Sequence, residues 1–299
     1  MKPTLVILAA GMASRYGSMK QIDGFGPNGE TIIDYSIYDA IQAGFGKVVF
    51  IIREEFAENF KSIFEPKLNG KIKTDYVFQS FDLKPYGIHE SIERAKPWGT
   101  AHAVLAAADA VKEPFCVINA DDFYGRDSYE KMAKFLTTEV KDDLFALMGF
   151  QIHKTLSEHG SVSRGICEVN GDGFLKDINE RTQVYFKDGN VVYEEHGVET
   201  PLNTTAAASM NFWGFTPQVF ADSKQLFVDF ALANKENPKA EFFIPLVADQ
   251  LIKSGKARFK VIPTESKWFG VTYKEDKTIV QQSIDQLVNS GIYPTELWG

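Results

Sequence analysis

The chain has 299 residues, of which 44% are hydrophobic and 24% charged, and its formal net charge at pH 7 is −8. This length can bury a full core, and the composition is that of an ordinary globular protein. The negative charge argues against a protein that binds nucleic acid over its whole surface, because such affinity comes mainly from cations placed on phosphates.

Strand and helix signals alternate through the first half of the chain. Short apolar runs predict buried strands at 5–10, 48–52, 74–79 and 115–119. Helical patterns lie between and after these runs, at 32–43, 56–64, 101–111 and 128–136. Apolar runs without polar alternation are typical of strands covered on both faces, so we expect a parallel sheet between helices.

The second half is richer in strands. Strands are expected at 145–152, 165–178, 191–193, 210–215 and 258–262, with a turn at 170–173 inside the second of them. Helices are expected at 217–234, 243–254 and 277–288. We therefore predict one α/β domain over residues 1–299, with a Rossmann-like, mostly parallel central sheet flanked by helices. Its two halves are 1–140 and a strand-rich part at 141–299.

The cysteines and the apolar stretches indicate the compartment. Neither Cys116 nor Cys167 has another Cys or a His at metal-ligand spacing, so we expect two buried free thiols, which suit a reducing environment. The apolar run at 5–10 is too short for a signal peptide, and no stretch approaches the ~18 apolar residues of a membrane helix. We expect a cytoplasmic protein without a membrane partner.

The loop that follows the first predicted strand carries two cations among small residues. It reads Gly11-Met12-Ala13-Ser14-Arg15-Tyr16-Gly17-Ser18-Met19-Lys20. Backbone N–H groups in such a loop can line an anion site, while Arg15 supplies a planar fork of donors and Lys20 a mobile point charge. The spacing is neither that of a Walker loop nor that of a dinucleotide fingerprint. A polyphosphate site is therefore the functional interpretation, and a surface loop with two solvated cations is the structural one.

Two further clusters come where predicted strands end, the edge at which open α/β sheets bind ligands. Gln79 ends one strand, and Gly99-Thr100 begins the helix before the next one. The Gln79 amide could read a pyrimidine edge, and Gly99 would let a base approach the backbone. Asp121-Asp122 follow the strand at 115–119, and Mg²⁺ would relieve the repulsion between their carboxylates. The structural alternatives are a solvated strand end and acidic residues before a helix.

In this order the motifs resemble those of the sugar-phosphate nucleotidyltransferases, and the resemblance covers nearly the whole chain. The opening loop is joined by Gln79, the segment at 99–103, Asn119-Ala120-Asp121, Gly165–Val169, Ile178–Arg181, Glu241–Pro245 and Trp268–Thr272. The short spacing from Arg15 to Lys20, followed by Gln21, looks like the branch that makes cytidylylated products. The later motifs look more like the sugar branch.

The resemblance implies a role for each matching position. Arg15 and Lys20 would act on the NTP phosphates, within an NTP-binding half at 1–140. Nucleotide contacts would come from Ala9, Ala10, Gly11, Gln79, Gly99 and Thr100. The acceptor, held by the half at 141–299, would contact Glu180, Arg181 and Asn211, with Arg181 standing where the family usually has Lys. Asp121 would bind Mg²⁺, the expected cofactor, and Asp122 beside it is the second candidate ligand.

The expected reaction is transfer of NMP from an NTP, with UTP or dTTP favoured, to a sugar 1-phosphate, giving an NDP-sugar and pyrophosphate. The family commonly has Trp-x-Asp-x-Gly-Thr near its end, whose Asp is a second metal ligand, but this chain has Trp268-Phe269-Gly270-Val271-Thr272. Either Asp122 compensates, or one carboxylate and substrate oxygens hold the metal, or catalysis is impaired. The alternatives are a cytidylyltransferase acting on a non-sugar phosphate, a nucleotide-sugar-dependent glycosyltransferase and a catalytically weak nucleotide-binding regulator. His102 is expected to be a helix-face residue rather than a general base, and the oligomeric state stays open.

Overall fold

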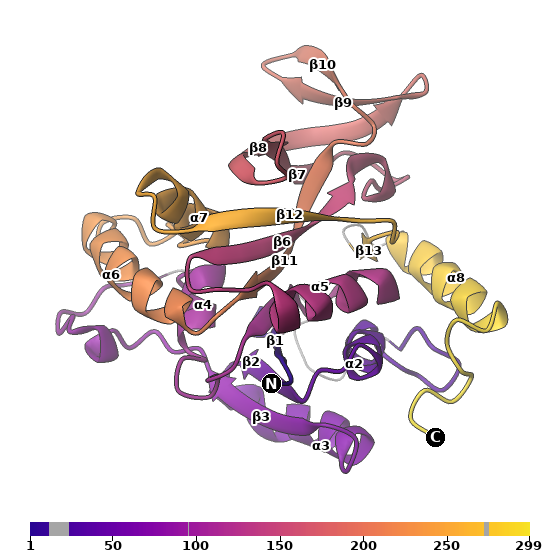
Figure 1. Cartoon of the computed structure of the whole chain (residues 1–299), viewed down its shortest axis with the longest axis horizontal. Helices are drawn as coiled ribbons and strands as arrows, with labels where there is room; N and C mark the ends of the chain where they lie inside the picture. The colour runs from indigo at the N-terminus through magenta and orange to yellow at the C-terminus, as the bar shows by residue number, and fades with distance from the viewer. Residues whose placement is uncertain (12–23, 95, 272–274) are drawn as a thin grey trace.

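The computed structural model describes residues 1–11, 24–94, 96–271 and 275–299, and its centre is one large twisted sheet (Figure 1). Four parallel strands form one side of this sheet in the order β3-β2-β1-β4. They are β1 (Thr4–Leu8), β2 (Lys47–Ile52), β3 (Lys73–Phe78) and β4 (Phe115–Asn119). The helices on the connections are α2 (Ile32–Gln42), α3 (Ala57–Leu68) and α4 (Thr100–Leu105). The predicted alternation of strands and helices in the first half is confirmed.

The second half enters the same sheet mainly by antiparallel pairing. β11 (Ala207–Phe215) lies antiparallel to β4 and also pairs with β6 (Leu144–Gln151) and β7 (Val162–Val169). Beyond β7, the sheet continues with β8 (Leu175–Lys187), β9 (Asn190–Glu195) and β10 (Val198–Leu202), which project from the body of the molecule in Figure 1. β12 (Arg258–Thr264) is parallel to β6.

The α/β class is confirmed, but the expectation of a mostly parallel sheet holds only for β1–β4 and the β6–β12 pair. The strands from β7 to β10 are antiparallel because their connections are a few residues long, and parallel neighbours need a crossover of a dozen residues or more. The turn predicted at 170–173 is one of these connections: the Asn170 amide donates to the carbonyl of Phe174 at 2.9 Å. The sequence therefore indicated the hairpins, although the sheet as a whole is mixed.

Helices cover both faces of the sheet. The apolar core on one face includes Ile37 of α2, Phe60 of α3 and Met132 of α5 (Arg126–Thr138). The core on the other face includes side chains of α4, of α6 (Gln218–Ala233) and of α7 (Ile244–Lys253). Leu5 and Ile7 of β1 belong to the first core and Val6 to the second, so this strand is buried on both faces as its apolar run predicts.

The structure departs from the predicted elements around α4 and at β5 and β13. The helix expected at 101–111 ends at Leu105, and the chain continues in tighter turns in which the amides of Ala107, Ala108 and Ala110 bond three residues back. Two strands of two residues each, β5 (Asp122–Phe123) and β13 (Phe269–Gly270), pair antiparallel beside α8 (Asp276–Asn289). Such short strands leave no periodic signal, and β5 and β13 are held by stacked Phe123 and Phe269 rings whose centroids lie 4.3 Å apart.

Two expectations from the composition can also be compared with the structure. Within the described residues, no helix is both long and apolar enough to cross a bilayer. Cys116 and Cys167 are buried free thiols, as predicted.

Candidate functional site

The chain leaves β1 at the carboxyl edge of the parallel strands. Ala9 donates its amide to Ile51 on β2 at 2.9 Å, while Leu8 accepts from Ala120 after β4 at 3.3 Å. Ala9 and Ala10 are buried, and a Cβ added to Gly11 would meet no atom of the described residues within 4 Å. Backbone from β1, β2 and β4 thus converges where the nucleotide was predicted. The cations of this loop, Arg15 and Lys20, lie outside the described residues, so their roles remain predictions.

Gln79 and Gly99, predicted to contact the base, lie together at the same edge. The Gln79 side-chain Nε2 donates to the Gly99 carbonyl at 3.3 Å and lies 3.3 Å from His102 Nδ1. Because a carbonyl can only accept, this contact fixes the orientation of the amide. His102 Nδ1 must then be an acceptor as well. Both N–H groups of the amide face the protein, and its carbonyl oxygen is the group left for a ligand.

His102 orients this amide from within the core. Its ring is 2% exposed and stacks on Phe227, with centroids 4.5 Å apart. Burial, together with the Arg94 charge, lowers the pKa of His102 to about 3. The imidazole is therefore neutral at physiological pH, and it lies on the packed face of α4, in line with its expected structural role.

Gly99 and Thr100 are joined to the segment at 241–245, which also carries one of the quoted motifs. Gly99 has φ of 102°, and a Cβ at this position would lie 2.6 Å from the Phe242 carbonyl oxygen. The Thr100 hydroxyl accepts from the Ile244 amide at 3.2 Å. The turn before α4 is therefore closed against the start of α7, and this explains why Gly is needed here.

Asp121 and Asp122 follow β4, as predicted, and Asp122 is firmly held. Its Oδ2 accepts from the Asn119 side chain at 2.8 Å and lies 3.2 Å from the Tyr124 hydroxyl. Burial and the neighbouring Asp121 charge raise the pKa of Asp122 above its usual range, against the opposing effects of its hydrogen bonds and of Arg164. A divalent cation would relieve this unfavourable burial of negative charge.

A chain of amide contacts ends on the Asp122 carboxylate. The Trp213 indole donates to Asn211 Oδ1 at 3.0 Å, and Asn211 Nδ2 donates to Asn119 Oδ1 at 2.7 Å. Since an indole can only donate, the direction of every bond down to Asp122 is fixed. Asn211 sits at a bulge of β11 with φ of 62°, a conformation that Asn tolerates. This residue, expected to contact the acceptor, has its amide turned toward Asn119 and Trp213.

The other two residues expected to contact the acceptor, Glu180 and Arg181, have different partners in the structure. Glu180 lies on β8 opposite Gly165, and burial raises its pKa while the Arg164 charge lowers it. Arg181 forms an ion pair with Glu195 at 3.3 Å, and its guanidinium carbon lies 4.6 Å from the centre of the Tyr193 ring. Arg181 is therefore paired with a residue of β9, while Glu180 stays within the electrostatic influence of the buried Arg164.

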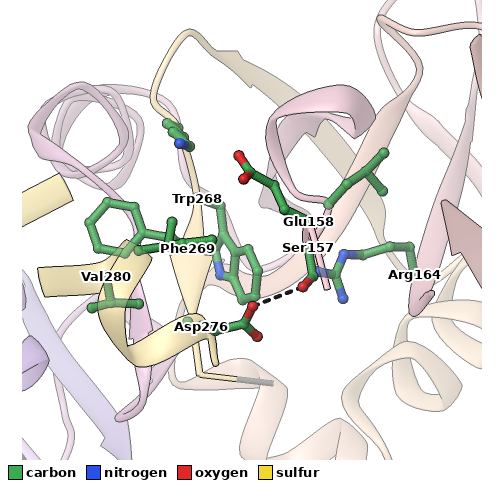
Figure 2. A pocket seen from close by; sticks show the side chains of 11 residues that line it. Ser157, Glu158, Arg164, Trp268, Phe269, Asp276 and Val280 are labelled. Carbon is green, nitrogen blue, oxygen red and sulfur yellow. Dashed lines mark hydrogen bonds between the residues drawn. The ribbon is translucent and has the colours of Figure 1, made fainter. Parts of the chain in front are cut away.

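Arg164 was not singled out from the sequence. Its buried guanidinium lines a small pocket together with Ser157, Glu158, Trp268, Asp276 and Gly270 (Figure 2). It donates to the Thr155 and Ser163 carbonyls and lies 4.7 Å from the Trp268 ring. Burial lowers the pKa of Arg164 to about 10, although Asp122, Glu180 and Asp276 act in the opposite direction. The sequence signal that could have identified Arg164 is a charged residue inside a largely apolar strand.

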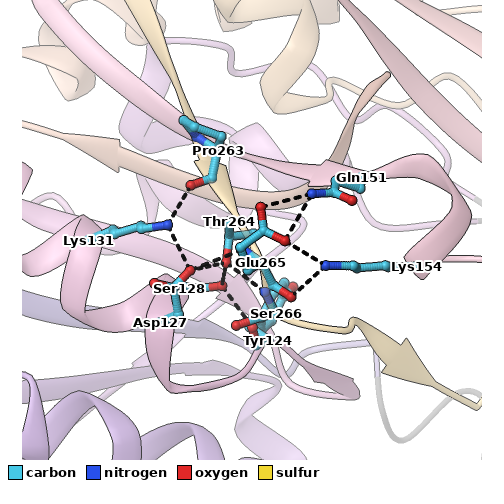
Figure 3. Close-up of polar contacts among 10 residues, drawn as sticks. All are labelled: Tyr124, Asp127, Ser128, Lys131, Gln151, Lys154, Pro263, Thr264, Glu265 and Ser266. Carbon is cyan, nitrogen blue, oxygen red and sulfur yellow. Dashed lines mark hydrogen bonds and ion pairs between the residues drawn. The ribbon is translucent and has the colours of Figure 1, made fainter. Parts of the chain in front are cut away.

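The segment that leads to β13 is fixed to α5 by polar contacts (Figure 3). Thr264 Oγ1 donates to Asp127 at 2.7 Å, and the Glu265 amide donates to the same oxygen at 3.2 Å. Lys154 forms an ion pair with Glu265 at 2.8 Å. These contacts set where Trp268 and Gly270 lie beside the acidic pair.

The donor set fits a magnesium ion shared with substrate. No three His, Cys, Asp or Glu side chains gather into a metal cluster in the part of the chain that the structure describes. Mg²⁺ is usually held by one or two carboxylates together with substrate phosphates and water, rather than by an all-protein cage. Asp121 and Asp122 are suited to this kind of site.

Comparison with known proteins points to one family. The family model described as nucleotidyl transferase matches residues 5–271. The chain is similar in structure to the inositol-1-phosphate CTP transferase from T. maritima, with a TM-score of 0.63, 12% identity and 96% of each chain covered. A protein from Bacillus anthracis described as a glucose-1-phosphate thymidylyltransferase gives a TM-score of 0.62 at 14% identity, with 94% of each chain covered.

A third similar structure is a UDP-glucose pyrophosphorylase in complex with UDP-glucose. Its TM-score is 0.59 at 15% identity, over 96% of this chain and 99% of that one. Among curated proteins, no sequence matches significantly. At these identities the structural likeness shows the fold.

Proposed function

The chain belongs to the nucleotidyl transferase family, and from this premise we propose that it transfers NMP from an NTP to a sugar 1-phosphate. The products are an NDP-sugar and pyrophosphate. A sugar 1-phosphate is already an anionic nucleophile at neutral pH, so the reaction needs no Ser, Cys or His nucleophile. The work of the protein is to align this phosphate with the α-phosphorus and to stabilise the charge that develops there.

The observation that carries the proposal is the convergence of the nucleotide motifs on one edge of the sheet. Ala9 bonds to β2, Gln79 bonds to Gly99, and Asp121-Asp122 follow β4. In open α/β sheets this carboxyl edge is where nucleotides bind. Arg15 and Lys20 are proposed to act on the phosphates, and Asp121 and Asp122 to hold Mg²⁺. When bound, Mg²⁺ would neutralise charge on the reacting phosphates.

We propose UTP or dTTP as the nucleotide. The N–H groups of the Gln79 amide contact Gly99 and His102, so its carbonyl oxygen is available to accept a hydrogen bond from a base. The N3–H of uracil or thymine can donate to such an oxygen, and so can the amino group of cytosine. Glu180, with its side chain near Arg164, is proposed to accept from sugar hydroxyls. Arg181 would have to leave Glu195 to reach the acceptor phosphate.

A matrix of pyrophosphate release tests the proposal. Each common NTP is combined with glucose 1-phosphate, other sugar 1-phosphates, inositol 1-phosphate and phosphocholine. We expect pyrophosphate to form in step with consumption of a sugar 1-phosphate, fastest with UTP or dTTP. Release with CTP and a non-sugar phosphate would favour a cytidylyltransferase, a candidate supported by the similar inositol-1-phosphate CTP transferase. Consumption of a nucleotide sugar without pyrophosphate would indicate a glycosyltransferase, and nucleotide binding without turnover a regulator.

Arg15→Ala tests the phosphate-binding loop. Loss of one charge that stabilises the transition state costs on the order of 3 kcal/mol, so turnover should fall about 10²-fold. Steady-state pyrophosphate release measures this, with exposed Arg258→Ala as the control variant. A fall of less than about threefold would remove Arg15 from the mechanism.

The cytoplasm remains the proposed location, on the ground of two free thiols.

A further inference from the structure

Gly270 on β13 lies directly opposite Asp122 on β5. A Cβ added to Gly270 would lie 2.8 Å from Asp122 Oδ1 and 3.2 Å from the Asp121 carbonyl oxygen. Real Cβ atoms essentially never come as close as the first of these distances. The space that a side chain of residue 270 would fill is therefore occupied by the Asp122 carboxylate.

The two oxygens of this carboxylate have different surroundings. Oδ2 accepts from Asn119 and lies beside the Tyr124 hydroxyl, whereas Oδ1 is the oxygen that faces Gly270. Carboxylates that bind metals are commonly oriented in this way, by hydrogen bonds to the oxygen that does not ligate. The Trp213–Asn211–Asn119 contacts fix the direction of the Asn119 bond. Asp122 is thus held with Oδ1 toward the β5–β13 junction, next to Asp121.

We propose that Gly270 is a positioning residue of the divalent-cation site: its missing side chain leaves the room in which the Asp122 carboxylate lies beside Asp121. The carboxylate that Trp268–Thr272 lacks is then supplied from the facing strand. This inference rests on the proposed function for the identity of the ion as a phosphate-bound divalent cation. The sequence left three possibilities for the missing carboxylate at Trp268–Thr272. The inference favours the first of them, in which Asp122 takes the place of that carboxylate.

Binding of Mn²⁺ alone to the full chain, followed by the electron paramagnetic resonance signal of the free ion, tests the proposal without turnover. Asp122→Asn should weaken Mn²⁺ binding at least about tenfold, and Gly270→Ala should weaken it by displacing the carboxylate. Asp172→Asn, in an exposed turn, and Gly171→Ala, with no atom within 4 Å of the added Cβ, are the matched controls and should bind as the unaltered chain does.

An exchange of the two side chains makes the test specific. Asp122→Ala combined with Gly270→Asp returns a carboxylate to the same space from the other strand, and should recover most of the Mn²⁺ affinity that Asp122→Ala loses. Near-ultraviolet circular dichroism checks that each variant is folded. If Gly270→Ala does not fold, Asp122→Asn, which keeps the size of the side chain, decides the question.

Undiminished Mn²⁺ binding by folded Asp122→Asn would overturn the proposal, as would a folded exchange variant with no recovery. An unaltered chain that binds no Mn²⁺ would overturn it too. Failure of the proposed function looks different: no NTP and acceptor pair releases pyrophosphate, while Mn²⁺ binding still depends on Asp122.

Discussion

At the scale of single residues, the candidate site depends on side chains whose chemistry allows one arrangement only. The Gly99 carbonyl can only accept, and the Trp213 indole can only donate. The first sets the Gln79 amide and the second sets the Asn119 amide. Each amide then has one defined orientation, with the Gln79 N–H groups toward Gly99 and His102 and the Asn119 N–H toward Asp122. Orientation at this site comes from obligate donors and acceptors in its surroundings.

Gly99→Ala should destabilise the protein strongly, because its Cβ would collide with backbone. The added atom would lie 2.6 Å from the Phe242 oxygen, and φ is 102°. We expect a loss of about 3 kcal/mol or more in the free energy of unfolding, measured by urea denaturation. Gly87→Ala is the control, since Gly87 also has positive φ, at 79°, but open space around it. It should lose only about 1 kcal/mol, and equal losses would exclude the steric explanation.

His102 should make stability depend on pH. Its pKa is about 3 in the folded chain and about 6.5 when unfolded, so below pH 6.5 the unfolded chain binds one proton more. Stability therefore falls as the pH drops, by about 2 kcal/mol at pH 5 relative to pH 8 from this residue. In His102→Gln, which does not titrate, this part of the pH dependence should vanish.

This prediction is tested by measuring the free energy of unfolding at pH 5 and pH 8 for three chains, of which the first two are the unaltered chain and His102→Gln. The third is His89→Gln, which removes an exposed histidine and serves as the control variant. Parallel profiles for the His102 variant and the unaltered chain would contradict the assignment of a buried neutral imidazole.

At the scale of elements, one buried carboxylate joins α2, α5 and the C-terminal segment. Asp39 of α2 accepts from the Tyr293 hydroxyl at 2.6 Å and lies 3.4 Å from Arg126 Nε of α5. Burial raises the pKa of Asp39 to about 7, although Tyr293 and Arg126 both lower it. Because α5 also holds the segment before β13, this contact connects the terminal region with the acidic site.

Tyr293→Phe should destabilise the chain more at high pH than at low pH. Above about pH 7 Asp39 is ionised and would lose a hydrogen bond to its charge, a loss of about 1–3 kcal/mol. Below pH 6 the carboxyl is protonated and the loss is smaller. Urea denaturation of the variant at pH 5.5 and pH 8.5 measures the difference. Tyr38→Phe, on a neighbouring ring whose centroid lies 5.9 Å away, is the control, and a loss independent of pH would contradict the reasoning.

At the scale of the whole molecule, the two predicted halves share one sheet and its cores. β11 of the second half pairs with β4 of the first. The core that contains Val6 and Val117 also contains Trp213 and Phe259. Neither half can bury these faces without the other, so the prediction of one domain over 1–299 implies one cooperative unit.

Calorimetry should therefore show a single unfolding transition, with equal calorimetric and van't Hoff enthalpies. Phe259→Ala, at a fully buried position, should remove about 3–5 kcal/mol and lower the temperature of that one transition without splitting it. The exposed substitution Phe186→Ala should change it little. A second transition that is insensitive to Phe259→Ala would show two independent units.

Much of the molecule could be predicted from local patterns. Apolar runs are long enough to mark β1, β2 and β4, and turn residues mark the hairpin at 170–173, because burial and turn geometry act on neighbouring residues. Family motifs placed Gln79 with Gly99 and put Asp121-Asp122 after β4. The early end of α4 was not visible, since its alanines suit both a helix and tighter turns.

Contacts between segments far apart in the chain could not be predicted from the sequence, and only the tertiary structure shows them. Nothing local says that Gly270 faces Asp122, that Asn211 turns to Asn119, or that Arg164 stacks on Trp268. The order of motifs along the chain therefore predicted the chemistry proposed for this edge of the sheet, with two adjacent carboxylates after β4. Only folding decided that Asp122 occupies the space beside Gly270, because the approach of two strands, and not the composition of either, determines which side chain fills a shared space.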